Sequence, residues 1–174
     1  MNPSTASEAD LIAAAHRGSR EARAELFGRH WEAVWRHARA LSGTPEAADD
    51  LTQDVFERAF RALGDFESRS GVRTWLLRIA TNRAIDLSRR SRPQEPLPDD
   101  LVSEIQAAAP EPELRKAVEE LAPERRAIVA LVYWLDLSLT EAADALGVPV
   151  GTAKSRLGRA LEELRERLGV TDAR

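Results

Sequence analysis

The chain has 174 residues, enough for one medium-sized domain or two small ones. Hydrophobic residues make up 43% of it and charged residues 31%, which allows a buried core and a solvated surface. Cysteine is absent, which excludes disulfide bonds and thiolate metal sites. No apolar run approaches the roughly 20 residues of a membrane span, and the N-terminus lacks a basic-then-apolar signal pattern. We therefore expect a cytoplasmic chain without direct membrane insertion.

The net charge of −4 is unevenly distributed. Residues 71–92 contain six arginines and one aspartate, whereas residues 93–114 contain six acidic residues and no lysine or arginine. Such segregation is typical of a nucleic-acid-binding helix beside an acidic connector. A solvated helix face beside a disordered linker would give the same pattern, so charge alone leaves both interpretations open.

Two helices are predicted near the N-terminus, over residues 7–17 and 19–41. Ser7 and Asp10 have the spacing of a capping box at the start of the first helix. The second helix has one apolar face at helical spacing, formed by Phe27, Trp31, Val34, Trp35, Ala38 and Leu41. We interpret both tryptophans as core residues.

A third helix is predicted from Thr44 to about Leu63. Thr44 is a cap residue, and Pro45 is favoured at the first helical position. Its first turns carry Glu46, Asp49, Asp50, Asp54 and Glu57. The helix dipole favours acidic groups near an N-terminus, but five acids before the first basic residue exceed what capping requires. The sequence therefore predicts a negative face for a basic partner.

Residues 64–71 form a predicted loop that contains Phe66, and a helix follows over residues 72–90. The apolar face of that helix consists of Val72, Trp75, Leu76, Ile79, Ala80 and Leu87, with Arg78, Asn82 and Arg89 on the opposite face. An aromatic loop followed by Asn and Arg suits single-stranded DNA. Arg83 falls on the apolar side, and the sequence gives no reason for it.

Residues 93–112 are rich in proline and acidic residues and poor in large apolar ones, which indicates a flexible linker. The predicted fold class is therefore all-α: two small helical domains, residues 1–92 and 113–174, joined by a flexible acidic linker.

The C-terminal domain begins with a predicted helix over residues 113–121, and Pro123 begins the next one. The inward-facing residues of that second helix are Ile128, Leu131, Val132 and Leu135. Ser138 and Glu141 form a predicted capping box for a helix that ends at Gly147.

The last predicted helix follows the turn at Val148-Pro149. Its apolar stripe, interpreted as core, is Val150, Ala153, Leu157, Leu161, Leu164 and Leu168. Small polar and basic residues lie away from this stripe near the start of the helix: Thr152, Lys154, Ser155, Arg156 and Arg159. This pattern suits a helix-turn-helix in a DNA major groove. An ordinary helical hairpin with a solvated face fits the periodicity equally well.

Four segments contain residue motifs that helical periodicity alone does not explain. They are DLTQDVF at 50–56, TWLLRIA at 74–80 followed by Asn82, LAPERR at 121–126, and VPVGTAKSRL at 148–157. In this order, across an acidic linker, they resemble the motifs of the extracytoplasmic-function (ECF) subfamily of bacterial RNA polymerase sigma factors. The resemblance covers nearly the whole chain.

The resemblance implies a promoter-specificity subunit of RNA polymerase. Domain 1–92 would be sigma region 2, and domain 113–174 would be sigma region 4. It implies binding to the polymerase β′ clamp helices through Asp49, Asp50, Gln53, Asp54 and Phe56. It implies minus-ten DNA recognition and melting through Phe66, Ser68, Arg69, Ser70, Trp75, Arg78, Asn82 and Arg89. It implies minus-thirty-five recognition through Thr152, Lys154, Ser155, Arg156 and Arg159.

Further partners implied by the resemblance are the β flap of the polymerase and an anti-sigma factor, with no cofactor. Val132 and Gly158 depart from the family pattern at positions that contact DNA in relatives. A stand-alone helix-turn-helix regulator is the alternative function, and a helical adaptor is a third. An enzyme is not expected, because the three histidines, His16, His30 and His37, have no metal-ligand spacing.

Overall fold

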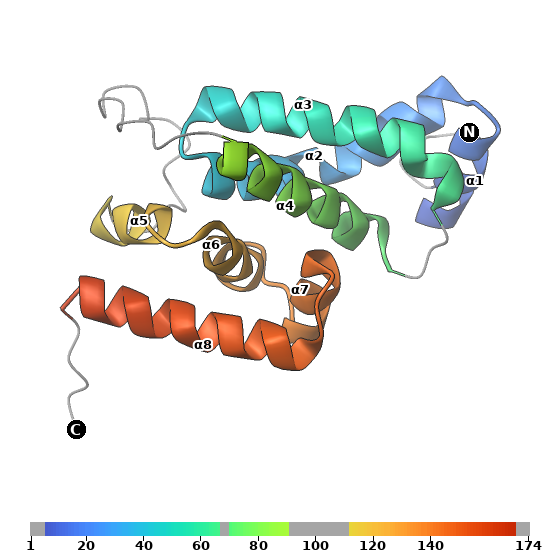
Figure 1. Cartoon of the computed structure of the whole chain (residues 1–174). Coiled ribbons are helices and arrows are strands. Elements are labelled where there is room, and N and C mark those ends of the chain that lie inside the picture. The colour runs from blue at the N-terminus through green and yellow to red at the C-terminus, as the bar shows by residue number, and fades with distance from the viewer. Residues whose placement is uncertain (1–5, 67–69, 91–111, 170–174) are drawn as a thin grey trace.

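The computed structural model describes residues 6–66, 70–90 and 112–169, and its regular elements there are all helical (Figure 1). The α-helices are α1 (Glu8–His16), α2 (Arg20–Ser42), α3 (Pro45–Ala62), α4 (Val72–Arg90), α5 (Pro112–Glu119), α6 (Pro123–Val129), α7 (Leu139–Leu146) and α8 (Val150–Arg167). A 3₁₀ turn, η2 (Leu63–Asp65), follows α3, and a π-helical segment, η4 (Ala130–Trp134), follows α6. The all-α prediction is confirmed. The predicted linker lies outside the described residues, except that Pro112 begins α5.

Side-chain caps explain why several helices begin where the sequence predicted. Ser7, Ser19, Thr44 and Ser138 each accept a hydrogen bond from the backbone N–H three residues later. Each such cap typically stabilises a helix by about 1 kcal/mol. Ser138 and Glu141 form the predicted reciprocal capping box. Gly147 ends α7 in the left-handed conformation, which a residue without a Cβ adopts most easily.

Helices α1–α4 pack around one core. Leu26, Val34, Val55 and Leu76 are at its centre and are fully or almost fully buried. Burying each of these side chains contributes about 1.5–3 kcal/mol. Helix α3 lies on the outer side of this bundle, and α4 lies on the side that faces the C-terminal helices (Figure 1).

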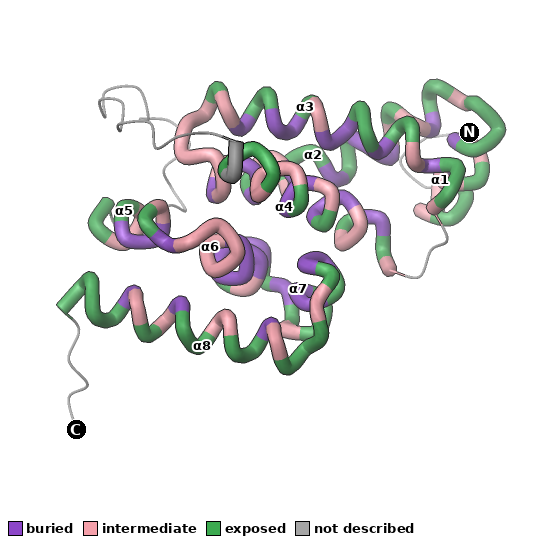
Figure 2. Tube along the Cα trace, viewed as in Figure 1, coloured by how far each residue is buried: buried purple, intermediate pink, exposed green. Residues whose placement is uncertain are grey.

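The C-terminal helices form two further clusters. One surrounds Ile128 and Leu131, and the other joins α5 and α6 to the C-terminal half of α8 through Leu121, Ala160 and Leu164. Helix α6 has no exposed residue and lies between α4 and α8 (Figure 2). The first of these clusters also contains Leu77 of α4, so the two halves of the chain share buried surface.

Several predicted core positions are exposed. Trp31 is 47% exposed although its ring packs on Phe56. Val150 and Leu168, at the two ends of the α8 stripe, are also exposed. Helical periodicity marks a face but not where packing against a neighbour stops, so these core assignments were wrong.

Candidate nucleic-acid and partner interfaces

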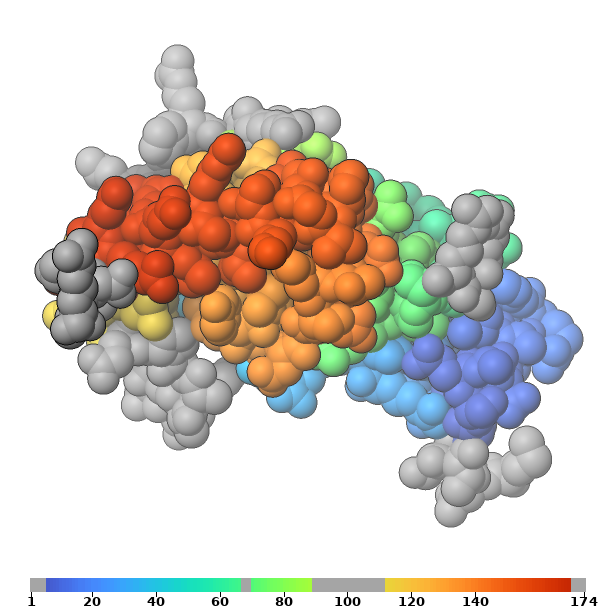
Figure 3. All heavy atoms as spheres, turned by 90° about the horizontal axis from the view of Figure 1, so that it is seen from below, coloured from blue at the N-terminus to red at the C-terminus, as the bar shows by residue number. Residues whose placement is uncertain are grey.

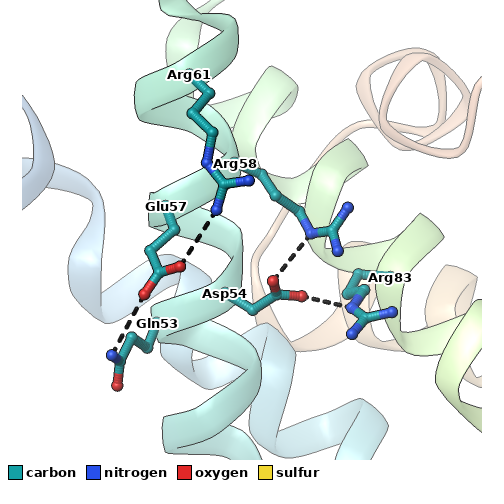
Figure 4. A network of polar contacts seen from close by, with 6 residues as sticks. All are labelled: Gln53, Asp54, Glu57, Arg58, Arg61 and Arg83. Atoms are coloured by element: carbon teal, nitrogen blue, oxygen red, sulfur yellow. Dashed lines mark hydrogen bonds and ion pairs between the residues drawn. The ribbon is translucent and has the colours of Figure 1, made fainter.

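The acidic face predicted for α3 lies at the surface. Asp49, Asp50, Gln53 and Glu57 are exposed. Asp49 is held in place by Trp35, whose Nε1–H donates to Asp49 Oδ1 at 2.7 Å. Glu57 accepts from Gln53 Nε2 at 3.4 Å and from Arg61 Nη2 at 3.3 Å, so it is bonded along α3 (Figure 4). All four side chains are nevertheless at the surface, where a basic partner can reach them.

Asp54 is different, because it points away from this face toward α4 (Figure 4). Its carboxylate accepts from Arg58 Nε at 3.0 Å and from Arg83 Nε on α4. Partial burial favours the protonated carboxyl, but the two guanidinium groups outweigh it and lower the pKa of Asp54. Arg83 thereby obtains the role that the sequence did not give: it joins α4 to α3. The pair also shows that the predicted docking residue Asp54 is bonded within the molecule.

Aromatic rings border the acidic face. Phe56 is buried, with Trp31 stacked on it at 5.4 Å between centroids and Phe27 at 4.7 Å. Phe60 is 37% exposed and meets Phe27 edge to face at 3.8 Å. Phe56 thus supports the surface from below, while Trp31 and Phe60 supply its exposed apolar edge. The sequence motif named Phe56 but not Trp31 or Phe60.

The residues predicted for minus-ten DNA are partly brought together. Phe66 and Trp75 are in ring contact, with centroids 4.8 Å apart and planes tilted by 43°. Both are partly buried against the first core, and Arg78 and Asn82 are exposed on the next turns of α4. Ser68 and Arg69 lie outside the described residues, as does the side chain of Arg89.

Arg78 lies against the turn of the helix-turn-helix. A Cβ at Gly147 would be 3.0 Å from Arg78 Nη2. A shallow surface cavity runs between these groups, lined by Ser70, Arg78, Ala143, Asp144, Gly147, Val148 and Pro149. The candidate strand-binding helix and the candidate duplex reader are therefore neighbours.

Helix α8 lies on the outside of the molecule (Figure 3). Lys154, Ser155 and Arg159 are exposed on it, and Thr152 and Arg156 are partly exposed. Ser155 Oγ donates back to the Thr152 carbonyl at 3.0 Å, so its hydroxyl is held close to the helix. The arrangement offers three positive charges, on Lys154, Arg156 and Arg159, and small polar groups to a duplex.

Two of the three histidines, His30 and His37, are buried, whereas His16 is exposed. His37 is fully buried, its Nε2 lies 2.8 Å from Thr81 Oγ1 on α4, and burial lowers its pKa to about 3. His30 lies beside Glu8 on α1, and desolvation lowers its pKa despite that carboxylate. Both rings are therefore packing groups. Within the described ranges, no cluster of three His, Cys, Asp or Glu could hold a metal ion.

No helix in the described part of the chain has the length and apolar character needed to cross a membrane.

Comparison with known proteins shows the family. Residues 26–94 match Sigma-70 region 2, and residues 112–164 match Sigma-70 region 4. The ECF RNA polymerase sigma factor SigM of Mycobacterium tuberculosis is 38% identical over 170 residues, covering 94% of this chain and 85% of that protein. The factor SigW of Bacillus subtilis is 29% identical, covering 87% of this chain and 91% of that protein.

Two solved structures share the fold. CnrH in complex with the cytosolic domain of CnrY matches with a TM-score of 0.72 at 30% identity, over 93% of this chain and 97% of that one. The sigma factor RpoE in complex with the anti-sigma factor NepR, from Bartonella quintana, matches with a TM-score of 0.61 at 27% identity, over 83% and 94%.

The helical fold and the two matched regions define an RNA polymerase sigma factor, a non-enzymatic subunit that directs transcription initiation. More closely, the chain belongs to the ECF family of these factors. Membership of this family decides against the stand-alone regulator and the adaptor.

Proposed function

We propose that α3 docks this factor on the β′ clamp helices of core RNA polymerase, that the segment from Phe66 to Asn82 holds the melted minus-ten strand, and that α8 reads the minus-thirty-five duplex. The single observation that carries this proposal is the Asp54–Arg83 pair. It joins the helix with the acidic face to the helix with the exposed Arg78 and Asn82, so docking fixes the position of the strand-binding groups.

The docking surface combines charge and apolar area. The exposed carboxylates of Asp49, Asp50 and Glu57, with the amide of Gln53, lie beside the exposed edges of Trp31 and Phe60. Carboxylates steer a basic partner, and buried aromatic edges supply most of the contact energy in protein interfaces. Phe56 acts indirectly, because it holds the ring of Trp31.

Strand capture uses the aromatic pair and the polar face of α4. A base removed from the duplex loses a few kcal/mol of stacking, and contact with an aromatic ring returns about 1–3 kcal/mol per base. Phe66 and Trp75, whose ring centroids are 4.8 Å apart, form such an aromatic platform, and Ser70 precedes α4. Arg78 and Asn82 would then contact phosphate and base edges. The family resemblance alone adds Ser68, Arg69 and Arg89 to the residues proposed to contact the minus-ten strand.

Duplex recognition uses the start of α8. Lys154, Arg156 and Arg159 supply positive charge for phosphates, and Thr152 and Ser155 are small enough to approach base edges. The family also suggests that this region contacts the β flap. We propose residues 1–92 as region 2, residues 93–112 as linker and residues 113–174 as region 4, which the matches at 26–94 and 112–164 support.

An anti-sigma partner fits the same picture. Two proteins of this fold were solved with protein partners, one of them named as an anti-sigma factor. We propose that such a partner restrains this chain as well. Since polymerase and promoter DNA are in the cytoplasm, we also place the chain there.

The direct test is reconstitution with core RNA polymerase on genomic DNA, followed by sequencing of transcript starts. The factor should produce a set of starts, with a common upstream pattern, that core polymerase alone does not give. An Asp50→Ala/Gln53→Ala factor serves as the docking control and, at a limiting concentration of factor, should give fewer of these starts. If the natural chain adds no start at any promoter, the proposed function is wrong.

A further inference from the structure

Helix α1 contacts both ends of the chain segment that carries the aromatic residue Phe66. Leu63, in η2, precedes this segment, and Val72, the first residue of α4, follows it. Both residues are buried in the N-terminal core. Helix α1 lies beside the end of α3, where η2 begins (Figure 1). One short helix can therefore reach the start and the end of the segment proposed to hold the strand.

The last residue of α1 binds the start of this segment. His16 Nε2 lies 2.6 Å from the Leu63 carbonyl oxygen. Because a carbonyl oxygen only accepts, the imidazole N–H donates this bond. The same oxygen accepts the backbone N–H of Phe66 at 3.1 Å, and its two lone pairs allow both bonds. The imidazole therefore orients the carbonyl group that fixes the backbone of Phe66.

The first residue of α1 binds the other end of the segment. Glu8 Oε1 accepts from the backbone N–H of Val72 at 3.4 Å. The first turn of α4 contains no acidic residue, and the first N–H groups of a helix have no partner within it. A carboxylate is favourable there because of the helix dipole. Trp75 lies on the same turn, where its N–H donates to the Gly71 carbonyl at 3.1 Å. Glu8 therefore caps the turn that carries Trp75.

Helix α1 is itself fixed to the N-terminal bundle. Leu11 and Ala15 are buried in the core of that bundle. Arg23 on α2 donates to the Ala15 carbonyl through Nε at 3.3 Å and through Nη2 at 3.2 Å. The second carboxylate oxygen of Glu8 lies 3.1 Å from His30 Nε2, also on α2. The two groups that reach the segment therefore extend from a helix whose own position is set by packing and hydrogen bonds.

We propose that α1 braces the proposed minus-ten site and that Glu8 and His16 are positioning residues for strand capture. They hold the rings of Phe66 and Trp75 in the geometry that receives an unstacked base. This inference rests on the proposed function, which assigns those two rings to the strand. Aromatic groups already held in their binding geometry lose less conformational freedom when a base stacks on them. Helix α1 precedes the residues that match Sigma-70 region 2, 26–94, so the match itself does not assign this role.

The test uses the full-length chain with saturating core polymerase, on a promoter found by the reconstitution experiment. Permanganate reactivity of the minus-ten thymines measures the rate of promoter opening, and fluorescence anisotropy measures affinity for core polymerase. The Glu8→Ala/His16→Ala variant should open the promoter about tenfold more slowly, the factor expected when hydrogen bonds of ordinary strength are lost. Its affinity for core polymerase should equal that of the natural factor, because neither residue lies on α3.

Conservative variants distinguish positioning from a general loss of stability. Glu8→Gln keeps an oxygen acceptor and His16→Gln keeps an N–H donor, so the double glutamine variant should recover most of the opening rate. Thr44→Ala is the stability control, because it removes the cap at the opposite end of α3. It should lower the thermal midpoint of unfolding without slowing promoter opening. Glu32→Ala, which removes an exposed acid on α2, is the charge control and should also leave the opening rate unchanged.

A natural opening rate in the double alanine variant would overturn the brace, as would equally slow opening by Thr44→Ala or by the double glutamine variant. If the double alanine variant does not fold, His16→Ala alone carries the same test, because this side chain is exposed. In each of these cases the natural factor still starts transcripts, so only the brace fails. If the natural factor gives no transcript starts, the proposed function fails, and the brace fails with it.

Discussion

Asp54 on α3 and Arg83 on α4 form an ion pair between residues 29 positions apart, and the pair joins the helix proposed for docking to the helix proposed for strand binding. Both side chains are about three-quarters shielded from solvent. Arg58 makes a second bond to the same carboxylate from within α3. The carboxylate therefore has a positioning role, which its place in an acidic surface motif conceals.

Removal of this carboxylate should destabilise the N-terminal bundle. Asp54→Asn is expected to lower the free energy of unfolding by about 1–2 kcal/mol, between the values for exposed and buried pairs. The folded-state pKa of Asp54 lies below the unfolded value, so its contribution is present above about pH 4 and is lost as pH falls through the folded-state pKa. Urea titrations from pH 7 to pH 3 measure this, with exposed Asp50→Asn as the control. Equal losses in the two variants would contradict the positioning role.

Core binding should depend on the exposed part of the same helix. Asp50→Ala/Gln53→Ala is expected to weaken affinity for core polymerase about tenfold, or about 1.4 kcal/mol, with unchanged thermal stability. Both side chains are exposed, so their loss leaves no cavity. Glu32→Ala, an exposed acid on α2, is the control. Fluorescence anisotropy with labelled factor provides the measurement, and an affinity equal to that of the control would remove α3 as the docking surface.

The duplex contact of α8 should show in the salt dependence of binding. Lys154→Ala/Arg159→Ala is expected to weaken binding to a minus-thirty-five duplex and to flatten the slope of log affinity against log salt by about 2, since each phosphate contact contributes about 0.9. Arg165→Ala is the control, because this arginine is exposed near the other end of α8. An unchanged slope would show that these two cations do not contact phosphate.

Much of this architecture could be predicted from local sequence, because caps and glycines act within a few residues. Ser7, Ser19, Thr44 and Ser138 gave the helix starts for that reason. Contacts between distant elements could not be predicted in the same way. The sequence shows Arg83 on an apolar side but not its partner, and it shows Leu77 beside the main apolar face but not the second core that buries it.

The same difference between local features and contacts of distant elements applies to the candidate surfaces. Motif spacing indicated the acidic face and the start of α8, but it missed Trp31 and Phe60, whose exposure depends on how α2 and α3 cross. The π-helical segment after α6 also escaped prediction, since Ala130–Trp134 has the composition of an ordinary buried helix.

Two glycines should respond oppositely to alanine. Gly147 has φ = 65°, and a Cβ there would meet Arg78 at 3.0 Å, so Gly147→Ala should destabilise the protein by about 1–2 kcal/mol. Gly28 lies within α2 with open space around it, so Gly28→Ala should stabilise by about 0.5–1 kcal/mol. Chemical denaturation measures both. Equal changes in the free energy of unfolding for the two substitutions would mean that the left-handed backbone at Gly147 does not determine the effect of alanine there.

His37 should make the fold acid-sensitive well above the range in which carboxylates titrate. Its folded-state pKa is about 3, because burial excludes the charged ring, whereas an unfolded histidine titrates near 6.5. The unfolded state therefore binds the extra proton, and stability falls as pH drops from about 6.5 toward 3. At pH 5 this loss amounts to about 2 kcal/mol relative to pH 7.

The test is His37→Gln, whose side chain can still bond Thr81 but does not titrate. This variant should be less stable than the natural protein at pH 7 but should lose about 2 kcal/mol less between pH 7 and pH 5. Urea titrations at both pH values provide the four free energies. The same decrease in both proteins would show that His37 takes up a proton without unfolding. A smaller decrease in the variant would establish that the ring between α2 and α4 must stay neutral for the bundle to hold.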